Sequence, residues 1–461
     1  MTIDRLLIAN RGEIAVRIVR AARELGIRTV QVYSQADADM LAVKLADEAV
    51  EIGPPRAAKS YLNVEAILKA AKDSGSDAVH PGYGFLAESA AFADAVEAAG
   101  LTFVGPTGAT IRLMGDKVSA RRVAKEAGVP AVPGSDGLIA DLDAACALAE
   151  EIAFPVFIKA AAGGGGRGIR VAENQGDLER YLPLARAEAQ AAFGDGGLYI
   201  EKLVSDARHI EVQVLGDGKR VVHCFERECS LQRRRQKVWE EAPAVTLTGE
   251  VRQALCEAAA GLARSMGYRG AGTIEFLYDD RTQAYYFIEM NTRIQVEHPV
   301  TECVTGIDLI REMIRIAGGE PLRWRQEDIR LQGHAIECRI NAEDPADDFM
   351  PHPGVVETLS VPGGPGVRFD GMIYPGCNVP PFYDSLLGKL IVWDETRPMA
   401  LTRLAGALKE LQITGIKTTK PLHQALADDE AVKSASFHTK FLEEWLENDP
   451  PGLVQHAGGG C

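Results

Sequence analysis

The chain has 461 residues, enough for roughly two to four domains with sizeable hydrophobic cores. Its 65 acidic and 50 basic side chains give a net charge of −15, which argues against a nonspecific nucleic-acid-binding protein. It has no apolar run long enough to span a membrane, no signal peptide in residues 1–9 and no CxxC pair among its cysteines, so we expect a cytoplasmic protein with reduced thiols.

The first part of the chain alternates apolar strands with helical patterns. Strands are predicted at residues 5–9, 29–34, 77–80 and 102–104, and helices after the turn at 10–13, at 63–73 and at 91–99. This alternation indicates βαβ units and a parallel sheet. The first turn lacks GxGxxG, so it does not predict a dinucleotide site. Residues 80–86 follow a strand at its carboxyl end, where such sheets bind ligands, although a plain Pro-Gly turn explains them equally well.

A lysine and a run of glycines come next. A helix is predicted at residues 116–127, and the apolar strand at 154–159 ends in Lys159. The glycines at 163–166 offer bare backbone N–H groups that could close on phosphate oxygens, although a glycine run alone is more typical of a flexible loop. No Gly-Lys-Ser/Thr follows, which excludes a Walker A loop. Lys117 and Lys159 are both suited to bind phosphate as compact positive charges.

A predicted hairpin brings two glutamates together. Strands are predicted at 198–204, 208–215 and 220–226 and a helix at 251–266, while the charged run 232–237 is by itself typical of a solvated face. Hairpin strands at 272–278 and 284–290 flank a turn at 279–282 and set Glu275 opposite Glu289. Either glutamate alone would be typical of a solvated face. Opposed like charges repel, so the pair with Asn291 on the same face indicates Mg²⁺ that also holds phosphate.

The residues after the hairpin carry a row of polar side chains. If residues 287–299 run extended, one face holds Glu289, Asn291, Arg293, Gln295 and Glu297. The row offers acceptors for a cation, donors for an anion and a carboxylate for a proton. A helix is predicted at 307–316.

From residue 331 the chain becomes β-rich. Strands are predicted at 334–340, 355–361 and 385–393, and helices at 397–411 and 422–426, before a closing segment at 439–446. Arg339 by itself is typical of a solvated or salt-bridged strand residue. We expect the glycine-rich tail at 447–461 to be disordered.

Several motifs in one order resemble the biotin carboxylase family, a branch of the ATP-grasp ligases. They lie at residues 8–13, 80–88, 114–117, 158–168, 287–302, 333–345 and 379–390. The resemblance implies an α/β and α+β fold with a Rossmann-like N-terminal domain at 1–115 and an ATP-grasp domain at 116–330. It further implies a mobile lid at about 130–204 and a β-rich C-terminal biotin carboxylase domain at 331–446.

The resemblance also implies a reaction. Members of the family use ATP with Mg²⁺ (or Mn²⁺) to phosphorylate bicarbonate, and the carboxyphosphate carboxylates N1 of biotin on a carrier protein. This is the first half-reaction of an acetyl-CoA or other acyl-CoA carboxylase, and through it of fatty acid biosynthesis. The implied partners are a biotin carboxyl carrier protein, carboxyltransferase subunits and a second copy of the chain, with no nucleic acid and no membrane.

Residue roles follow from the same resemblance. It implies nucleotide contacts from Lys117, Lys159, Gly164, Gly165, Gly166, Glu201, Val204, His209, Gln232, Arg235, Glu275 and Glu289. It implies a metal site of Glu275, Glu289 and Asn291, in agreement with the hairpin argument, and a bicarbonate site of Lys237, Arg293, Gln295 and Val296. Glu297 matches the base that deprotonates bicarbonate and Lys237 a cation near the carboxyphosphate, and the resemblance places Lys237 and Arg293 among the catalytic residues. Arg339 matches the residue that stabilises the biotin enolate, and Tyr83 lies beside the biotin ring.

One position departs from the family pattern, and two other functions compete. Arg235 stands where the family usually has histidine, which keeps a donor but adds bulk and a permanent charge. One alternative is another ATP-grasp ligase that joins a carboxylate to an amine, against which residues 293–297 and the β-rich domain argue. The other is a nucleotide-binding regulator without catalysis, favoured only by Arg235 and opposed by Glu297 and Lys237.

Overall fold

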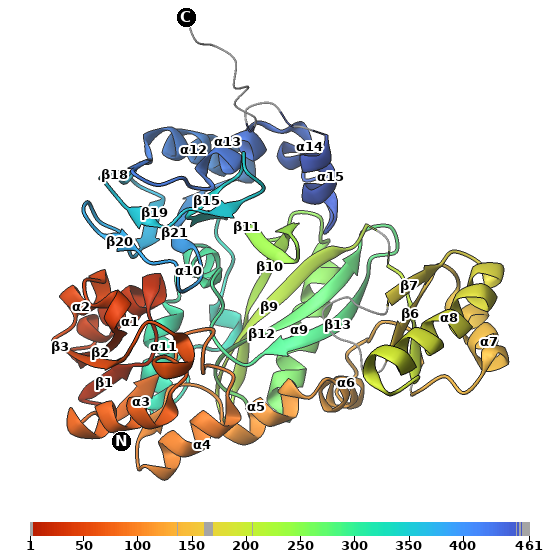
Figure 1. Cartoon of the computed structure of the whole chain (residues 1–461), viewed down its shortest axis with the longest axis horizontal. Helices are drawn as coiled ribbons and strands as arrows, with labels where there is room; N and C mark the ends of the chain where they lie inside the picture. The colour runs from red at the N-terminus through yellow and green to blue at the C-terminus, as the bar shows by residue number, and fades with distance from the viewer. Residues whose placement is uncertain are drawn as a thin grey trace, which may run out of the picture.

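The computed structural model describes residues 3–135, 137–160, 169–204, 206–448, 450 and 453. Figure 1 shows an N-terminal lobe, a C-terminal lobe above it, a long central sheet and a small lobe that stands apart on the right. The predicted glycine contacts Gly164, Gly165 and Gly166 and most of the expected tail lie outside the described residues. Among the described helices, none combines the length and the apolar character that a membrane crossing requires.

The N-terminal lobe is the predicted parallel sheet. Its strand order is β3-β2-β1-β4-β5, and every pair in it is parallel. The strands are β1 (Arg5–Ile8), β2 (Arg28–Ser34), β3 (Glu48–Gly53), β4 (Ala78–His80) and β5 (Thr102–Phe103). The helices of this part are α1 (Gly12–Glu24), α2 (Leu41–Leu45), α3 (Val64–Asp73), α4 (Ala90–Ala98) and α5 (Gly108–Gly115). Short 3-10 turns lie at Gln35–Asp37 and Ala57–Lys59. The Rossmann-like prediction is therefore confirmed, because buried apolar strands alternate with amphipathic helices.

The small lobe is a three-stranded antiparallel sheet with helices packed on it. Its order is β7-β6-β8, from β6 (Val156–Ala160), β7 (Ile169–Ala172) and β8 (Leu198–Lys202). Helices α7 (Leu142–Ile152) and α8 (Gln175–Phe193) complete a hydrophobic core of its own. Helix α6 (Lys117–Glu126) lies between this lobe and α5 in Figure 1.

An eight-stranded antiparallel sheet forms the centre of the molecule. Its order is β13-β12-β9-β10-β11-β14-β21-β19. The strands are β9 (Arg208–Asp217), β10 (Val221–Arg233), β11 (Gln236–Ala242), β12 (Arg269–Asp279), β13 (Ala284–Asn291), β14 (His334–Asn341), β19 (Val367–Gly371) and β21 (Leu386–Asp394). Because β11 pairs with β14, the sheet runs across the expected domain boundary at residues 330 and 331 and brings both sides to one site.

Helices cover this sheet and connect its strands. They are α9 (Gly249–Ser265), α10 (His298–Thr305), α11 (Leu309–Ala317), α12 (Arg397–Glu410), α13 (Lys420–Asp428), α14 (Glu430–Lys433) and α15 (Phe441–Glu447), with a 3-10 turn at Gln326–Asp328. The remaining short strands pair as β15 (Glu343–Asp344) with β16 (Met350–Pro351), β17 (Gly354–Val355) with β20 (Asn378–Val379), and β18 (Thr358–Ser360) with β22 (Gln412–Thr414).

Two predicted strands were wrong in extent. The strand expected at 355–361 is divided into β17 and β18, because Val356 donates its backbone N–H to Cys377 while Glu357 donates to Thr414 on a different segment. The extended run expected at 287–299 ends at Asn291. Thr292 donates to the Glu88 carboxylate instead of a neighbouring strand, and α10 starts at His298 with a proline in its first turn.

Candidate active site

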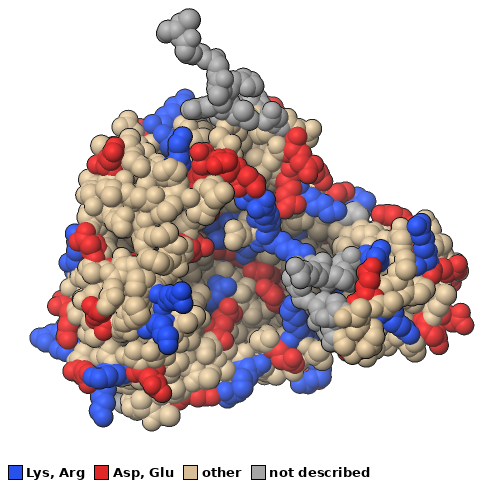
Figure 2. All heavy atoms as spheres, in the orientation of Figure 1, with Lys and Arg blue, Asp and Glu red and all other residues tan. Residues whose placement is uncertain are grey.

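A hollow between the main body and the small lobe gathers charged side chains of both signs, as Figure 2 shows. The β12–β13 hairpin contributes its predicted pair, because Glu275 lies opposite Glu289 in the observed register. Asn291 donates from Nδ2 to Glu275 Oε1 at 2.9 Å. Partial desolvation and the charge of Glu275 raise the pKa of Glu289. These oxygen donors fit Mg²⁺, which would neutralise the repulsion between the two carboxylates.

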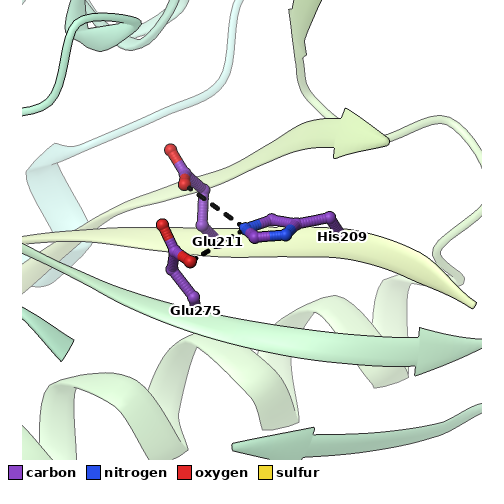
Figure 3. Close-up of side chains that lie close together, drawn as sticks. All are labelled: His209, Glu211 and Glu275. Carbon is purple, nitrogen blue, oxygen red and sulfur yellow. Dashed lines mark ion pairs between the residues drawn. The ribbon is translucent and has the colours of Figure 1, made fainter. Parts of the chain in front are cut away.

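A histidine joins the carboxylates on the neighbouring strand. Figure 3 shows His209 and Glu211 of β9 beside Glu275 of β12. His209 Nε2 lies 3.1 Å from Glu275 Oε2 and 3.9 Å from Glu211 Oε2. The ligand atoms of the three residues lie within 4.8 Å of one another, so this set could also hold a cation. His209 thus links the predicted nucleotide contacts to the predicted metal site.

Lys237 lies at the centre of these acidic groups. Its Nζ contacts Glu211, Glu275 at 3.0 Å and Glu297 at 2.8 Å. Burial alone would lower the pKa of Lys237, but the attraction of the three carboxylates, Glu211 first, holds it well above its ordinary value. Lys237 therefore supplies a permanent positive charge where Glu275 and Glu297 meet.

The composition of the charged run 232–237 indicated a solvated face, but the structure exposes only part of the run. It forms the β10–β11 hairpin, in which Gln232 pairs with Lys237 across the two strands. The turn residues Arg234 and Arg235 are exposed, both with positive φ, 48° and 66°, and so is Gln236 after them. Gln232 is buried and donates to the Cys229 carbonyl at 2.8 Å. The strand alternation, rather than the charge of the run, decides which side chains point inward.

Glu297, the predicted base, is held between two cations. It is the capping residue just before helix α10 and is fully buried. Lys237 contacts its Oε1 at 2.8 Å, and Arg339 Nη2 contacts its Oε2 at 3.0 Å. Burial alone would raise the pKa of Glu297, but Lys237 and Arg339 hold it well below its ordinary value. The carboxylate is therefore ionised at neutral pH and can accept a proton.

Arg339 connects the C-terminal lobe to this carboxylate. It lies on β14 and donates from Nε to Glu240 Oε1 of β11 at 2.6 Å. Its backbone carbonyl accepts from Thr419 Oγ1 at 2.9 Å and lies 2.7 Å from His423 Nε2. Of the two local predictions for Arg339, the salt-bridged one is confirmed and the solvated one is wrong, because the pairing of β11 with β14 places Arg339 beside the fully buried Glu240.

Arg293 and Gln295 form a group of donors next to the hairpin that carries the predicted metal site. Arg293 contacts Glu88 Oε2 at 2.9 Å, Asn291 Oδ1 at 3.1 Å and Gln295 Oε1 at 3.1 Å. Gln295 is buried, and its Nε2 has no hydrogen-bond partner in the part of the chain that the structure describes. A guanidinium beside a free amide donor suits a small anion. The carbonyl of Val296, the next residue, accepts a hydrogen bond from Lys389 at 2.8 Å.

The two predicted phosphate-binding lysines lie on different parts of the molecule. Lys117 is exposed at the first position of α6, which follows the capping residue Asp116. Lys159, in the small lobe, contacts Glu201 across β6 and β8. Burial alone would raise the pKa of Glu201, but Lys159 and then Arg121 lower it. Val204, half-buried, follows β8. The small lobe thus holds Lys159, Glu201 and Val204, whereas Lys117 lies on the connecting helix.

Several residues of the site escaped the sequence analysis. Glu211 and Arg227 are fully buried partners, with Arg227 Nε 2.6 Å from Glu211 Oε1, and Glu240 and Glu88 hold the two active-site arginines. Three of these charged residues interrupt apolar strand patterns in β9, β10 and β11. Charged residues inside an apolar strand were the available signal for Glu211, Arg227 and Glu240, and Glu88 gave none.

The chain matches three family models in order. They are described as "Biotin carboxylase, N-terminal domain" at residues 2–111, "Carbamoyl-phosphate synthase L chain, ATP binding domain" at 116–325 and "Biotin carboxylase C-terminal domain" at 337–444. Together these matches extend over most of the chain.

Similar proteins share this length and fold. "Biotin carboxylase 1" of Bacillus subtilis is 54% identical over 444 residues, which cover 96% of this chain and 99% of that protein. One of the pyruvate carboxylase subunits of Methanothermobacter thermautotrophicus is 49% identical over 96% of this chain and 90% of its own length. The biotin carboxylase domain dimer of 2-oxoglutarate carboxylase from Hydrogenobacter thermophilus, solved with MgADP, ADP and bicarbonate, is 47% identical with a TM-score of 0.86. The match covers 99% of this chain and 100% of that one.

Proposed function

This chain belongs to the biotin carboxylase family of ATP-dependent ligases, and from that premise we propose that it carboxylates biotin on a carrier protein with MgATP and bicarbonate. The observation that supports the proposal most is the position of Glu297. An ionised carboxylate, fully buried, lies between Lys237 and Arg339. A general base beside two fixed cations is what a poor nucleophile such as bicarbonate needs in order to attack a phosphoryl group.

We assign the groups of the site to the steps of this reaction. Arg293, the free amide of Gln295 and the backbone of Val296 bind bicarbonate, and Glu297 removes its proton as a bicarbonate oxygen attacks the γ-phosphorus of ATP and ADP leaves. Glu275, Glu289 and Asn291 would hold Mg²⁺, which neutralises charge on the transferred phosphoryl group when bound. Lys237 stabilises the carboxyphosphate anion.

Carboxyphosphate then divides into CO₂ and phosphate, and N1 of biotin bonds to the CO₂ carbon. The phosphate released from carboxyphosphate accepts the N1 proton of biotin, Arg339 stabilises the negative charge that biotin then carries, and Tyr83 lies beside the ring. Carboxyphosphate hydrolyses in water, so a closed site is required. We propose residues 130–204, with Lys159 and the glycines at 164–166, as the lid over the nucleotide.

The acceptor of the carboxyl group and the partner chains are separate parts of the proposal. We propose an acyl-CoA as the acceptor. A biotin carboxyl carrier protein and a carboxyltransferase on other chains would deliver the carboxyl group to it. Relatives named for pyruvate and 2-oxoglutarate carboxylation make these two keto acids the competing acceptors. We also propose a homodimer, since the solved relative is described as a dimer. Its mass in solution would be twice the chain mass of 49.7 kDa.

The experiment that tests this function is phosphate release from ATP with Mg²⁺, bicarbonate and free biotin, each omitted in turn. Release that requires bicarbonate and rises with biotin supports the proposal. Release that ignores biotin but responds to an amine or another carboxylate would assign the chain to a different ATP-grasp ligase. A reconstituted assay with the carrier and carboxyltransferase, supplied with acetyl-CoA, pyruvate or 2-oxoglutarate, then identifies the acceptor.

A further inference from the structure

We propose that Lys389 is a positioning residue, which together with Glu13 fixes the backbone just before Glu297 and the phenol of Tyr83. The inference rests on the proposed function, because it assigns the consequence to bicarbonate and biotin. Lys389 belongs to the segment 379–390, which the sequence analysis singled out only as a motif and which no step of the reaction uses. Lys389 touches no reacting atom and acts through the groups that it holds.

One ammonium group joins three separate parts of the molecule. Lys389 lies on β21, and its Nζ donates to the Val296 carbonyl at 2.8 Å and pairs with Glu13 Oε1 at 3.0 Å. Glu13 comes from the first turn of α1 in the N-terminal lobe and accepts the hydroxyl hydrogen bond of Tyr83. The C-terminal sheet, the first helix and the loop before α10 therefore meet at this lysine.

The burial of Lys389 shows that it is not a surface lysine held by chance. Its side chain has 0% exposure, and that of Glu13 has 1%. Its neighbours on β21, Leu387 and Leu390, are fully buried apolar residues, and an apolar side chain at position 389 would fill the same space. A buried ion pair contributes little stability compared with well-packed apolar groups. Stability therefore does not explain a lysine at this position, whereas the directional hydrogen bonds that it makes do.

The surrounding acids keep the lysine charged. Burial alone would lower the pKa of Lys389, but Glu13, Glu337 and Asp370 raise it above its ordinary value. Glu337 is fully buried, and neither of its carboxylate oxygens has a hydrogen-bond partner within the described chain. Of these three acids, Glu13 is the one that pairs with Lys389, since Asp370 pairs with Arg368 and burial raises the pKa of Glu337 well above its ordinary value. Lys389 stays protonated and donates to the Val296 carbonyl.

The position of this contact explains its effect on the chemistry. The Val296 carbonyl belongs to the peptide group that links Val296 to Glu297, so Lys389 orients the backbone of the proposed base. Arg339, which holds the carboxylate of Glu297, is paired with Lys389 across β14 and β21. The base is therefore held at both its backbone and its carboxylate. A displacement of about 1 Å at such a site can reduce turnover by roughly 100-fold.

The test compares Lys389→Met, which keeps the length of the side chain but removes the donor, with the parent chain. We expect the KM for bicarbonate in phosphate release to rise at least tenfold, while calorimetry shows a Kd for ATP within twofold. Arg397→Met is the matched control, because it breaks another buried pair, Arg397 with Glu241 at 2.6 Å, away from Val296. The control should lower Tm without changing the KM for bicarbonate.

A milder variant keeps the test decisive if Lys389→Met does not fold. Glu13→Gln removes the charge that faces Lys389 and leaves Tyr83 only a weaker, neutral acceptor, and we expect at least a threefold rise in the KM for bicarbonate. Combined with Tyr83→Phe, its effect on the KM for biotin should be smaller than the product of the two single effects, because both act on one contact.

Hydrogen exchange measures the positioning without any turnover. Backbone amides in peptides that cover residues 293–298 should exchange faster in Lys389→Met than in the parent or in Arg397→Met. If the parent shows no bicarbonate-dependent phosphate release, the proposed function fails, while this exchange result still decides the role of Lys389. Unchanged exchange in Lys389→Met with an unchanged KM for bicarbonate overturns the inference, and so does an equal rise in KM in Arg397→Met.

Discussion

Replacement of Glu297 by glutamine tests the central assignment of the site. The change is nearly isosteric and removes one negative charge from a fully buried position. Lys237 keeps Glu211 and Glu275 as partners, and Arg339 keeps Glu240 at 2.6 Å. No buried cation is left unpaired, so we expect the variant to fold and to bind ATP with a Kd close to that of the parent.

The size of the expected loss follows from the role of the carboxylate. A positioned general base contributes about 10²- to 10⁴-fold to a rate, so bicarbonate-dependent phosphate release should fall by at least about 100-fold. The pKa of Glu297 is held well below its ordinary value by Lys237 and Arg339, despite burial. Glu297 in the substrate-free parent therefore stays ionised down to pH values below its ordinary range, and kcat/KM for bicarbonate should not fall near pH 6 through its protonation.

The assay is phosphate release at saturating MgATP, with and without bicarbonate, together with calorimetric titration of ATP. Glu240→Gln is the matched control, because it removes the other carboxylate that holds Arg339 and touches neither Lys237 nor the bicarbonate donors. The rate of phosphate release by Glu240→Gln should fall less than tenfold. If Glu297→Gln retains more than a tenth of the parent rate, or if both variants lose the same factor, Glu297 only anchors Arg339 and the base must be sought elsewhere.

Four further changes test other parts of the structure. Arg339→Ala should abolish carboxylation of free biotin while the Kd for ATP changes less than threefold, and equal losses in both would make Arg339 structural. Glu289→Ala should remove Mg²⁺-dependent ATP turnover at least 100-fold, whereas unchanged turnover would refute its metal role. Arg235→His should leave turnover within tenfold of the parent, since Arg235 is exposed at a hairpin turn, and a larger rise would mean that the present site is impaired. Glu228→Gln should raise Tm relative to the parent at pH 8.5 but not at pH 5. Burial raises the pKa of Glu228 to about 7, against an ordinary 4.5, so the parent loses about 3 kcal/mol of stability as pH rises from 4.5 through 7. A Tm difference that does not vary with pH would contradict this.

Local patterns in the sequence predicted the parts of the site that lie on one hairpin or one strand. The pairing of Glu275 with Glu289 is confirmed, but the turn alone does not set it. Asp279 pairs with Ala284 next to the turn, and an irregularity between Glu275 and Phe276 then shifts the register by one residue, so that Glu275 faces Glu289. The parallel N-terminal sheet is also confirmed, because the alternation of strands and helices is a local property of the sequence. The extended run to Glu297 was wrong, because the partner that ends β13 is the Glu88 side chain, which is distant in sequence.

The sequence by itself thus determined many of the strands and helices, the carboxylate pair and, through its motifs, the family. Only the tertiary structure decided that Lys237 contacts Glu297 60 residues away and that Arg339 contacts it from 42 residues on the other side. It also decided that Lys389 holds the Val296 carbonyl from 93 residues away. Periodicity indicates which face of an element is buried, but the pairing of β11 with β14 and of β14 with β21 determines which buried charges meet. The protonation states of those charges depend on that pairing, because each pKa is set by burial and by the opposite charges within a few ångströms.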